Sequence, residues 1–472
     1  MPRPASPEPR SPAASPLPHG ARDLAFQVLD EYKRQGTFVR AALDERARAA
    51  LIAPADRALA VELAFGVVRR QSTLNTILQA HVRRPRHNIE GALWTLLQIG
   101  AYQVVFLESM PRHAAVDETV ETAKRLGRRR WAGFLNGTLR SVAASVSDEL
   151  LDHPAADAVP LAAGRFRRSD RPLFADPGRE PADYFARAFS FPDWLVARWA
   201  GRFDFEELVR LGFWFNAPQA HYLRVNRLLT SRDDLLAALA QAGVDARPGE
   251  LPESIRLESS RNIERLPGFD AGWFSVQDET AMRAAVLLDP QPGMHVLDLC
   301  AAPGTKAAHL AERMANQGRI IAADVNPQRR GQIDETARRL RLDMIEPRAI
   351  HADGSNLPEG PFDAALVDVP CSNTGVLGKR PEARWRIGPR DLDELPRLQQ
   401  RLLLDACRRV KAGGRVAYST CSIEPEENER VVQAVVSRQA GIVLSDEVQY
   451  APGRPADGGY QALLERRAGQ AS

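Results

Sequence analysis

Two cysteines each follow a short apolar run with strand character. Cys371 lies in the motif Asp368-Val-Pro-Cys after FDAALV, and Cys421 lies in Tyr-Ser-Thr-Cys after GRVA. Because neighbouring parallel strands end at the same edge of a sheet, both thiols are expected at one ligand-binding edge. A single cysteine there would most often be a small packed hydrophobe. Two thiols with a carboxylate three residues before one of them indicate covalent catalysis, in which either thiol could attack.

A glycine-containing turn after an earlier apolar run, HVLDL, indicates a ligand site. Such a turn, between a strand and a helix, brings backbone N–H groups close to a ligand. Alone the pattern is a weak signal, because ordinary tight turns share it. The residues expected to contact a ligand here are Cys300, Ala301, Ala302, Pro303, Gly304, Thr305 and Lys306.

Two acids at the ends of later segments strengthen the case for a cofactor. Asp324 ends IIAAD, where a carboxylate can accept both hydroxyls of a ribose. Asp353 ends IHAD and is expected at the adenine edge, with Asp368 nearby. The order of glycine turn, acid and acid favours an adenosyl ligand. The turn lacks G-x-G-x-x-G, which disfavours a dinucleotide.

The elements that would position these residues alternate from about Trp273 onward. Helical stretches separate four strand-like runs, HVLDLC, RIIAADV, FDAALVDV and GRVAYST. This alternation predicts a Rossmann-like α/β domain over residues 271–468, with its ligands at the carboxyl ends of the strands.

The preceding chain divides into four segments, as expected for a multidomain protein of 472 residues. Residues 1–20 are rich in Pro, Ser and Arg and are expected to be disordered. Residues 21–147 show apolar residues three or four apart, which predicts an all-α bundle. Residues 148–182 contain several Pro, Gly and Asp and are interpreted as a linker. Residues 183–270 mix both patterns, which predicts a small α/β module.

The composition limits the kinds of partner that the protein can bind. The net charge of +3 excludes a global polycation, so any nucleic-acid surface must be local. The four cysteines form no C-x-x-C pair, and no signal-peptide pattern or membrane-length apolar run occurs. A cytoplasmic monomer without metal or membrane contact is expected. The candidate RNA contacts are Lys379, Arg384, Arg128, Arg129 and Arg130; for the arginine run, a solvated helix end is an equal alternative.

The motifs CAAPGTK, DVPCSNTGV and YSTCS, followed by EPEENE, resemble those of RNA 5-methylcytosine methyltransferases of the RsmB/Sun/Fmu type. The resemblance extends to residues 21–142, which look like a NusB-like RNA-binding domain through DRALAVELAFGVVRR and GFLNGTLR. LRVN and SVQDE resemble a connecting module. The family resemblance implies S-adenosylmethionine as the cofactor and 16S rRNA as the partner.

The resemblance also implies roles for the two cysteines. The Thr-Cys cysteine attacks in this family, which falls on Cys421, and the Pro-Cys cysteine assists product release, which falls on Cys371. Asp368 would bind the N3/N4 edge of the cytosine and, being anionic, needs a nearby cation to keep a thiolate stable. Lys306, Lys379 and Arg384 are the candidates for that cation.

Two departures from the family pattern concern the cofactor turn and the Pro-Cys motif. Thr305 replaces the usual second glycine, so the backbone there must avoid positive φ, and Val369 replaces an alanine. Two alternatives stay open: the same chemistry on tRNA or large-subunit rRNA, and a non-catalytic RNA-binding assembly or antitermination factor. The presence of Asp368, Cys371 and Cys421 disfavours the second.

Overall fold

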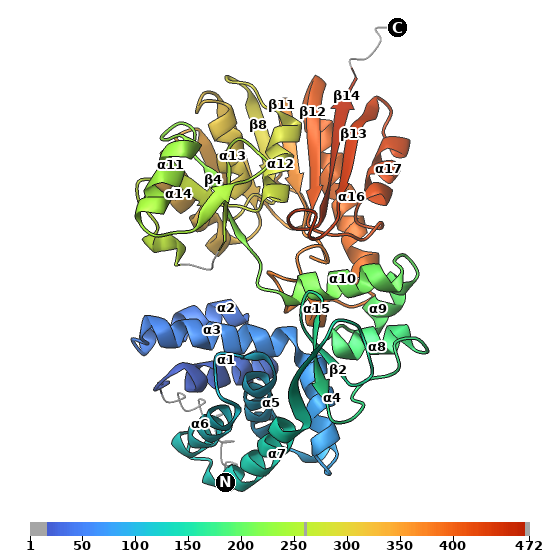
Figure 1. Ribbon diagram of the computed structural model, residues 1–472. Coiled ribbons are helices and arrows are strands. Elements are labelled where there is room, and N and C mark those ends of the chain that lie inside the picture. Colours follow the sequence, from blue (N-terminus) through green and yellow to red (C-terminus); the bar gives the residue numbers. More distant parts are fainter. Residues whose placement is uncertain (1–16, 259–261, 468–472) are drawn as a thin grey trace, which may run out of the picture. The chain divides into compact units, whose positions relative to one another are not determined.

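The computed structural model describes residues 17–258 and 262–467, so most of the tail predicted at residues 1–20 lies outside the described residues. The chain forms two compact units, residues 1–216 and 217–472, and each is described by itself (Figure 1). Within the described ranges, no helix is both long and apolar enough to cross a membrane.

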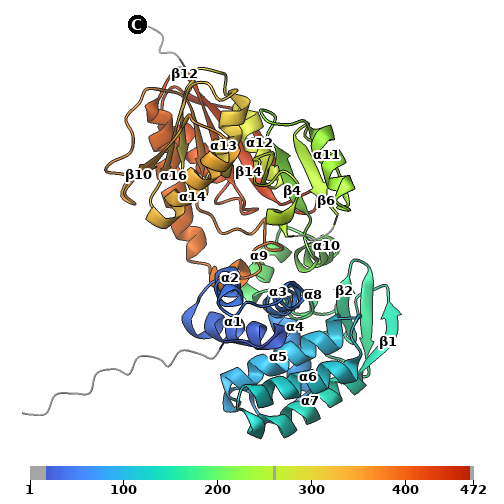
Figure 2. The ribbon, with the colours of Figure 1, turned by 90° about the vertical axis from the view of Figure 1, so that its left-hand side faces the viewer.

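The first unit begins with the predicted helical bundle. The central helix α5 is buried on nearly all sides, and α5, α6 and α7 pack side by side (Figure 2). A side chain at Gly100 would come within 2.4 Å of Leu139, so glycine allows α5 to approach α7 closely. The helices are α1 (Ala21–Gln35), α2 (Val39–Ala49), α3 (Pro54–Arg69), α4 (Gln71–His81), α5 (Gly91–Phe106), α6 (Arg112–Arg125) and α7 (Ala132–Ser145).

The segment interpreted as a linker contains a three-stranded antiparallel sheet in its first half. Its strands are β1 (Val146–Leu151), β2 (Ala158–Ala162) and β3 (Arg165–Ser169), in the order β1-β3-β2. The Pro, Gly and Asp residues that suggested a linker fall largely in the turns and in the loop that follows β3. Helices α8 (Pro181–Ala188), α9 (Asp193–Ala200) and α10 (Phe205–Asn216) complete the unit. The module expected over 183–270 is therefore divided between the two units.

The second unit opens with a small antiparallel sheet of order β5-β6-β4-β7. Helix α11 (Arg232–Gln241) covers it through Leu235 and Leu239, which pack with strand residues in one apolar cluster. The strands are β4 (His221–Val225), β5 (Ala246–Pro248), β6 (Ser254–Leu257) and β7 (Phe274–Val276). β4 and β6 supply the strand part of the mixed pattern that residues 183–270 show.

A seven-stranded mixed sheet forms the rest of the second unit, in the order β10-β9-β8-β11-β12-β14-β13. Its first five strands are parallel, and β14 is antiparallel to both of its neighbours. The strands are β8 (His295–Leu299), β9 (Arg319–Asp324), β10 (Ile345–Ala349), β11 (Phe362–Asp368), β12 (Val410–Thr420), β13 (Ile442–Tyr450) and β14 (Gly459–Arg466).

Helices cover both faces of this sheet. One apolar cluster joins the sheet to α12 (Glu279–Leu288), α13 (Thr305–Arg313) and α14 (Pro327–Leu340). The other joins it to α16 (Asp391–Arg409) and α17 (Glu429–Arg438), and Cys407 lies in this cluster. The predicted Rossmann-like architecture is confirmed, with an antiparallel pair added at one edge.

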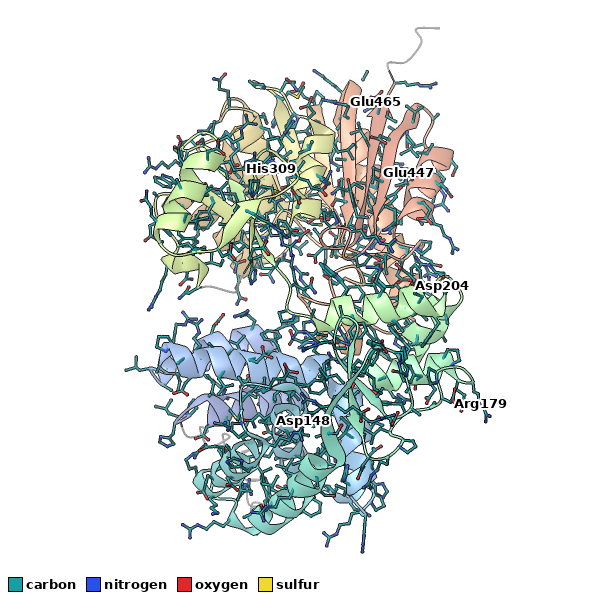
Figure 3. All side chains as sticks on the ribbon, viewed as in Figure 1. Asp148, Arg179, Asp204, His309, Glu447 and Glu465 are labelled. Carbon is teal, nitrogen blue, oxygen red and sulfur yellow. The ribbon has the colours of Figure 1, made fainter. Side chains whose placement is uncertain are left out.

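Buried polar contacts join the small sheet to the helix that follows the glycine turn. Arg224 of β4 is fully buried and pairs with Glu312 of α13 through two contacts of 2.7 and 3.0 Å. Arg224 also donates to the Thr305 carbonyl at 2.8 Å, which ties it to the turn itself. His309, labelled in Figure 3, adds a contact of 3.1 Å to Glu253.

We expect Arg224→Ala to lower the free energy of unfolding of this region by about 3–5 kcal/mol, because Glu312 would remain buried without its cation. Urea dependence of hydrogen exchange at the α13 amides measures the change. Arg247→Ala is a matched control, since the pair between Arg247 and Glu258 is partly exposed and should cost less than about 1 kcal/mol. Equal losses in both variants would contradict this account of the buried pair.

Candidate active site

The two candidate thiols meet in adjacent loops at the carboxyl ends of β11 and β12. The strands pair in parallel up to Asp368 and Ser419, so the loops that follow them start side by side. The Sγ atoms of Cys371 and Cys421 lie 3.1 Å apart, and neither cysteine forms a disulfide. One thiol can therefore donate its hydrogen to the other.

The surroundings of the two sulfurs differ in charge. The hydrogen bond from Cys371 lowers the pKa of Cys421, and the cations Arg380 and Lys306 lower it further, against the opposing effects of burial and Asp368. The hydrogen bond with Cys421, burial and the carboxylate of Glu427 raise the pKa of Cys371 well above its usual value. Arg380 is held near Cys421 because it donates to Asn373 Oδ1 at 2.6 Å, and that oxygen lies 3.3 Å from Cys421 Sγ. Cys421 is therefore the thiol that ionises first.

This asymmetry predicts the order in which the cysteines react. Iodoacetamide at neutral pH should alkylate Cys421 at least about tenfold faster than Cys371, because the thiolate is the nucleophile. Cys421 should also keep reacting at a lower pH than an ordinary thiol. Mass spectrometry of peptides after brief labelling measures both rates, with buried Cys407 as the slow reference. Faster labelling of Cys371 would reverse the assignment.

Lys306 supplies the cation beside Asp368. Its Nζ lies 2.7 Å from Asp368 Oδ2, and both side chains line the same cleft as the thiols. Burial lowers the pKa of Lys306, but Asp368 outweighs burial and the net shift is upward. The lysine therefore stays charged and offsets a carboxylate that would otherwise disfavour a thiolate nearby.

The glycine turn has left-handed backbone at two positions, and at Gly304 it packs closely against α14. Cys300 and Gly304 both have positive φ, at 63° and 97°, and a Cβ at Gly304 would come within 3.0 Å of the backbone of Ile333. Thr305 is the first residue of α13, so the position that departs from the family pattern has helical backbone. Behind the turn, Asp324 Oδ2 accepts from the amide of Ala302 at 3.1 Å.

Asp298 is a further candidate that the sequence motif contained but did not distinguish. It is fully buried in β8, and among the described residues neither of its carboxyl oxygens has a hydrogen-bond partner. Burial and the neighbouring Asp368 raise its pKa well above the usual value. A polar residue inside the apolar run HVLDL was the available signal. A buried carboxyl group without partners beside the turn is a further candidate for contact with a polar ligand.

One cleft of about 500 Å³ within the second unit contains the thiols, the Lys306–Asp368 pair and part of the turn, whereas Asp298 and Asp324 are not among its lining residues. Its lining joins the turn to the thiols and to a polar rim formed by Tyr222, Asp278 and Asp457. Among the predicted site residues, the lining includes Cys300, Ala302, Pro303, Thr305, Lys306, Asp368, Cys371, Lys379 and Cys421. Asp353 lies outside it as an exposed residue that accepts from the amide of Ser355 at 2.9 Å.

The candidate RNA contacts differ from one another in burial and in the groups that they contact. Lys379 forms ion pairs with Asp278 and, at 2.9 Å, with Asp457, so its charge is balanced inside the cleft. Arg384 is buried and donates to the Leu377 carbonyl at 3.4 Å. The three consecutive arginines of the first unit, Arg128, Arg129 and Arg130, are exposed.

Comparison with known proteins shows which family the chain belongs to. Family profiles match three successive parts: the NusB family at residues 19–144, a ferredoxin-like domain of RsmF/B-like methyltransferases at 191–264, and 16S rRNA methyltransferase RsmB/F at 285–460. A probable ribosomal RNA small subunit methyltransferase B of Synechocystis is 34% identical over 88% of each chain. The chain belongs to the RsmB family of ribosomal RNA small subunit methyltransferases.

Two further matches agree with this membership. Ribosomal RNA small subunit methyltransferase B of Shigella sonnei is 32% identical over 94% of both chains. A crystal structure titled PH0851 shares the fold, with a TM-score of 0.74 and 23% identity over 93% of this chain and 98% of that one. The resemblance found in the motifs is confirmed over nearly the whole chain, including the NusB-like domain. This RsmB-family chain is therefore an rRNA methyltransferase with a small connecting module.

Proposed function

We propose that this methyltransferase methylates C5 of one cytosine in small-subunit (16S) rRNA, through a covalent bond between Cys421 and C6 of the base. The observation that carries the proposal is the thiol pair, 3.1 Å apart, in one cleft with the ion pair of Lys306 and Asp368. Cytosine C5 is a poor nucleophile until a thiolate adds at C6 and makes it enamine-like. A site for this reaction needs an ionised thiol, a group that binds the base, and a second group that helps to resolve the adduct.

The proposed cofactor is S-adenosylmethionine, which supplies an electrophilic methyl group when it is bound. The turn from Cys300 to Lys306 would hold it through backbone groups, with Asp324 at the ribose and Asp353 at the adenine edge. Asp298 is proposed as a further contact, because its buried carboxyl group has no hydrogen-bond partner among the described residues. No group of three metal-ligating side chains occurs in the part of the chain that the structure describes.

Each polar group of the cleft has a proposed role. The Cys421 thiolate forms a bond to C6, and the electron pair of the C5–C6 double bond moves toward C5. Asp368 binds the N3/N4 edge of the base, and Lys306 balances its charge. After the methyl group is in place, water takes the C5 proton, and the electron pair of that C–H bond re-forms the double bond, which expels Cys421 as a thiolate. Cys371 assists this release, since it lies next to the leaving sulfur.

The RNA is proposed to be held partly by the first unit. A cavity of about 650 Å³ there is lined by Lys33, Arg86 and Arg128, among other residues, and exposed Arg129 and Arg130 lie near Arg128 in the chain. The names of the curated relatives support small-subunit rRNA over tRNA. Because the base edges of structured RNA are hidden, the target cytosine is proposed to lie in a loop or to be splayed out. We also propose that the enzyme acts as a monomer in the cytoplasm.

Bisulfite sequencing of RNA from a strain that lacks the gene tests this function. We expect one 5-methylcytosine to be lost from 16S rRNA and to be restored by the wild-type gene, but not by the gene for Cys421→Ala. Loss of a tRNA or 23S site would support the alternative substrates. An unchanged methylation pattern in all these RNAs would contradict the proposal.

A further inference from the structure

Glu427 is a buried carboxylate that none of the proposed steps uses. Its Oε1 accepts from the Ser372 amide at 2.8 Å, and its Oε2 accepts from the Ser422 hydroxyl at 2.5 Å and from the Ser372 hydroxyl. Ser372 directly follows Cys371, and Ser422 directly follows Cys421. One carboxylate thus holds the residue that follows each thiol.

The two cysteine loops are joined by side chains where the strand pairing has ended. The last paired residues are Asp368 and Ser419. Beyond them the Ser372 and Ser422 hydroxyls lie 3.2 Å apart, and the Thr374 hydroxyl accepts from the Ile423 amide at 3.0 Å. Glu427 lies at the centre of this network, and its loss would leave several buried polar groups unpaired.

Two neighbouring side chains hold Glu427 itself in place. Gln399 of α16 donates to Glu427 Oε1 at 3.0 Å and to the Pro370 carbonyl at 2.9 Å. Tyr418 of β12 donates to the backbone carbonyl of Glu427 at 2.6 Å. The carboxylate is thus oriented from two elements on either side of the loops, which is what a rigid support for reacting groups requires.

The negative charge of Glu427 affects the pKa of Cys371 more than the pKa of Cys421. Its carboxylate is among the causes that raise the pKa of Cys371, after the hydrogen bond to Cys421 and burial. Glu427 is absent from the main influences on Cys421, where the cations Arg380 and Lys306 act instead. Burial raises the pKa of Glu427 above its usual value, and four donated hydrogen bonds limit this rise because they stabilise the charged form.

We propose that Glu427 is a positioning residue, which holds the two cysteine loops at the separation where Cys371 donates its hydrogen to Cys421. This inference rests on the proposed function, because the different catalytic roles of the two thiols are part of that proposal. The charge of Glu427 has a second effect, which is to keep Cys371 the protonated member of the pair. Glu427 is not among the residues that line the cleft, so it acts through the two loops and through its charge.

The test compares Glu427→Gln, Glu427→Ala and the matched control Glu426→Gln in the full-length protein. Gln keeps the shape of the side chain, and serine hydroxyls can accept as well as donate, so this variant removes chiefly the charge. Ala removes all the hydrogen bonds that the Glu427 carboxylate accepts. Glu426 is the adjacent carboxylate, which pairs with Arg430 at 2.7 Å.

Two readouts need no methylation activity. The pH at which iodoacetamide begins to label Cys371 should fall in Glu427→Gln, because the nearby negative charge is gone. Formation of a Cys371–Cys421 disulfide by diamide, which takes up the two thiol hydrogens, should be at least about tenfold slower in Glu427→Ala, because effective concentration falls when two groups lose their alignment. A merely structural role for Glu427 would leave the Cys371 pH profile of Glu427→Gln unchanged.

The third readout is turnover with rRNA. We expect kcat to fall by about 100-fold in Glu427→Ala, as for a misplacement on the order of 1 Å, with KM for S-adenosylmethionine within about twofold of wild type. Glu426→Gln should match the wild type in all three measurements. Unchanged thiol readouts in both Glu427 variants would overturn the inference. If the wild type shows these thiol readouts but methylates no cytosine, then the proposed function fails while the role of Glu427 stands.

Discussion

Replacing Cys421 by alanine is expected to lower methyl transfer to rRNA by more than about 1,000-fold, because the covalent route to an activated C5 is lost. Cofactor binding should remain nearly intact, since the sulfur lies in a loop at the end of β12, whereas the cofactor is proposed to sit at the turn after β8. Incorporation of a labelled methyl group measures the first effect, and calorimetric titration with S-adenosylmethionine measures the second.

Cys407→Ala is the matched control for Cys421→Ala. Cys407 lies in the apolar cluster beneath α16, so its loss should cost stability but leave turnover per folded molecule unchanged. Loss of cofactor binding in Cys421→Ala would show a structural role for this thiol. Full activity in that variant would transfer the nucleophilic role to Cys371.

Replacing Cys371 by alanine is expected to allow the bond between Cys421 and the RNA to form and to slow its breakdown. The covalent complex should then accumulate and appear as a slow-migrating band on denaturing gels, with turnover reduced by at least about 100-fold. The same change removes the hydrogen bond that lowers the pKa of Cys421. Adduct formation should therefore be slow at neutral pH and recover as the pH is raised.

The double variant Cys371→Ala/Cys421→Ala separates this outcome from non-covalent trapping. It should give no slow-migrating band at any pH, because no thiol remains beside the base. If Cys371→Ala gives no band even at high pH, the proposed division of labour between the thiols is wrong.

Local sequence patterns were sufficient to predict the elements that carry the site. Periodicity predicted the helical bundle, and the strand-like runs predicted β8, β9, β11 and β12 with both cysteines just beyond strand ends. The pattern failed at β1, whose residues are mostly exposed and do not alternate, and whose neighbouring turn residues suggested a linker. The antiparallel pair β13 and β14 was also missed. Its register is set by contacts with β12, which no local pattern specifies.

The contacts within the site could not be read from local spacing. Lys306 and Asp368 lie on different βα units, and Glu427 reaches Ser372 across 55 positions of the chain. Only the folded arrangement shows which of three candidate cations faces Asp368. The same holds for the two thiols, because the charges that distinguish Cys421 from Cys371 come from side chains distant in sequence. The choice of Cys421 over Cys371, first made by family resemblance, stays a prediction, and the cations near Cys421 favour it.

The most direct test of the central claim is to identify the residue that becomes bonded to a trapped RNA. In 16S rRNA transcribed with 5-fluorocytidine, the fluorine at C5 cannot leave as a proton does, so the covalent complex persists after methyl transfer. Trypsin places the two candidate thiols in different peptides, residues 416–430 for Cys421 and 349–379 for Cys371. The account predicts the nucleotide remnant on Cys421. A remnant on Cys371, or methylation of normal RNA with no trapped complex, would contradict it.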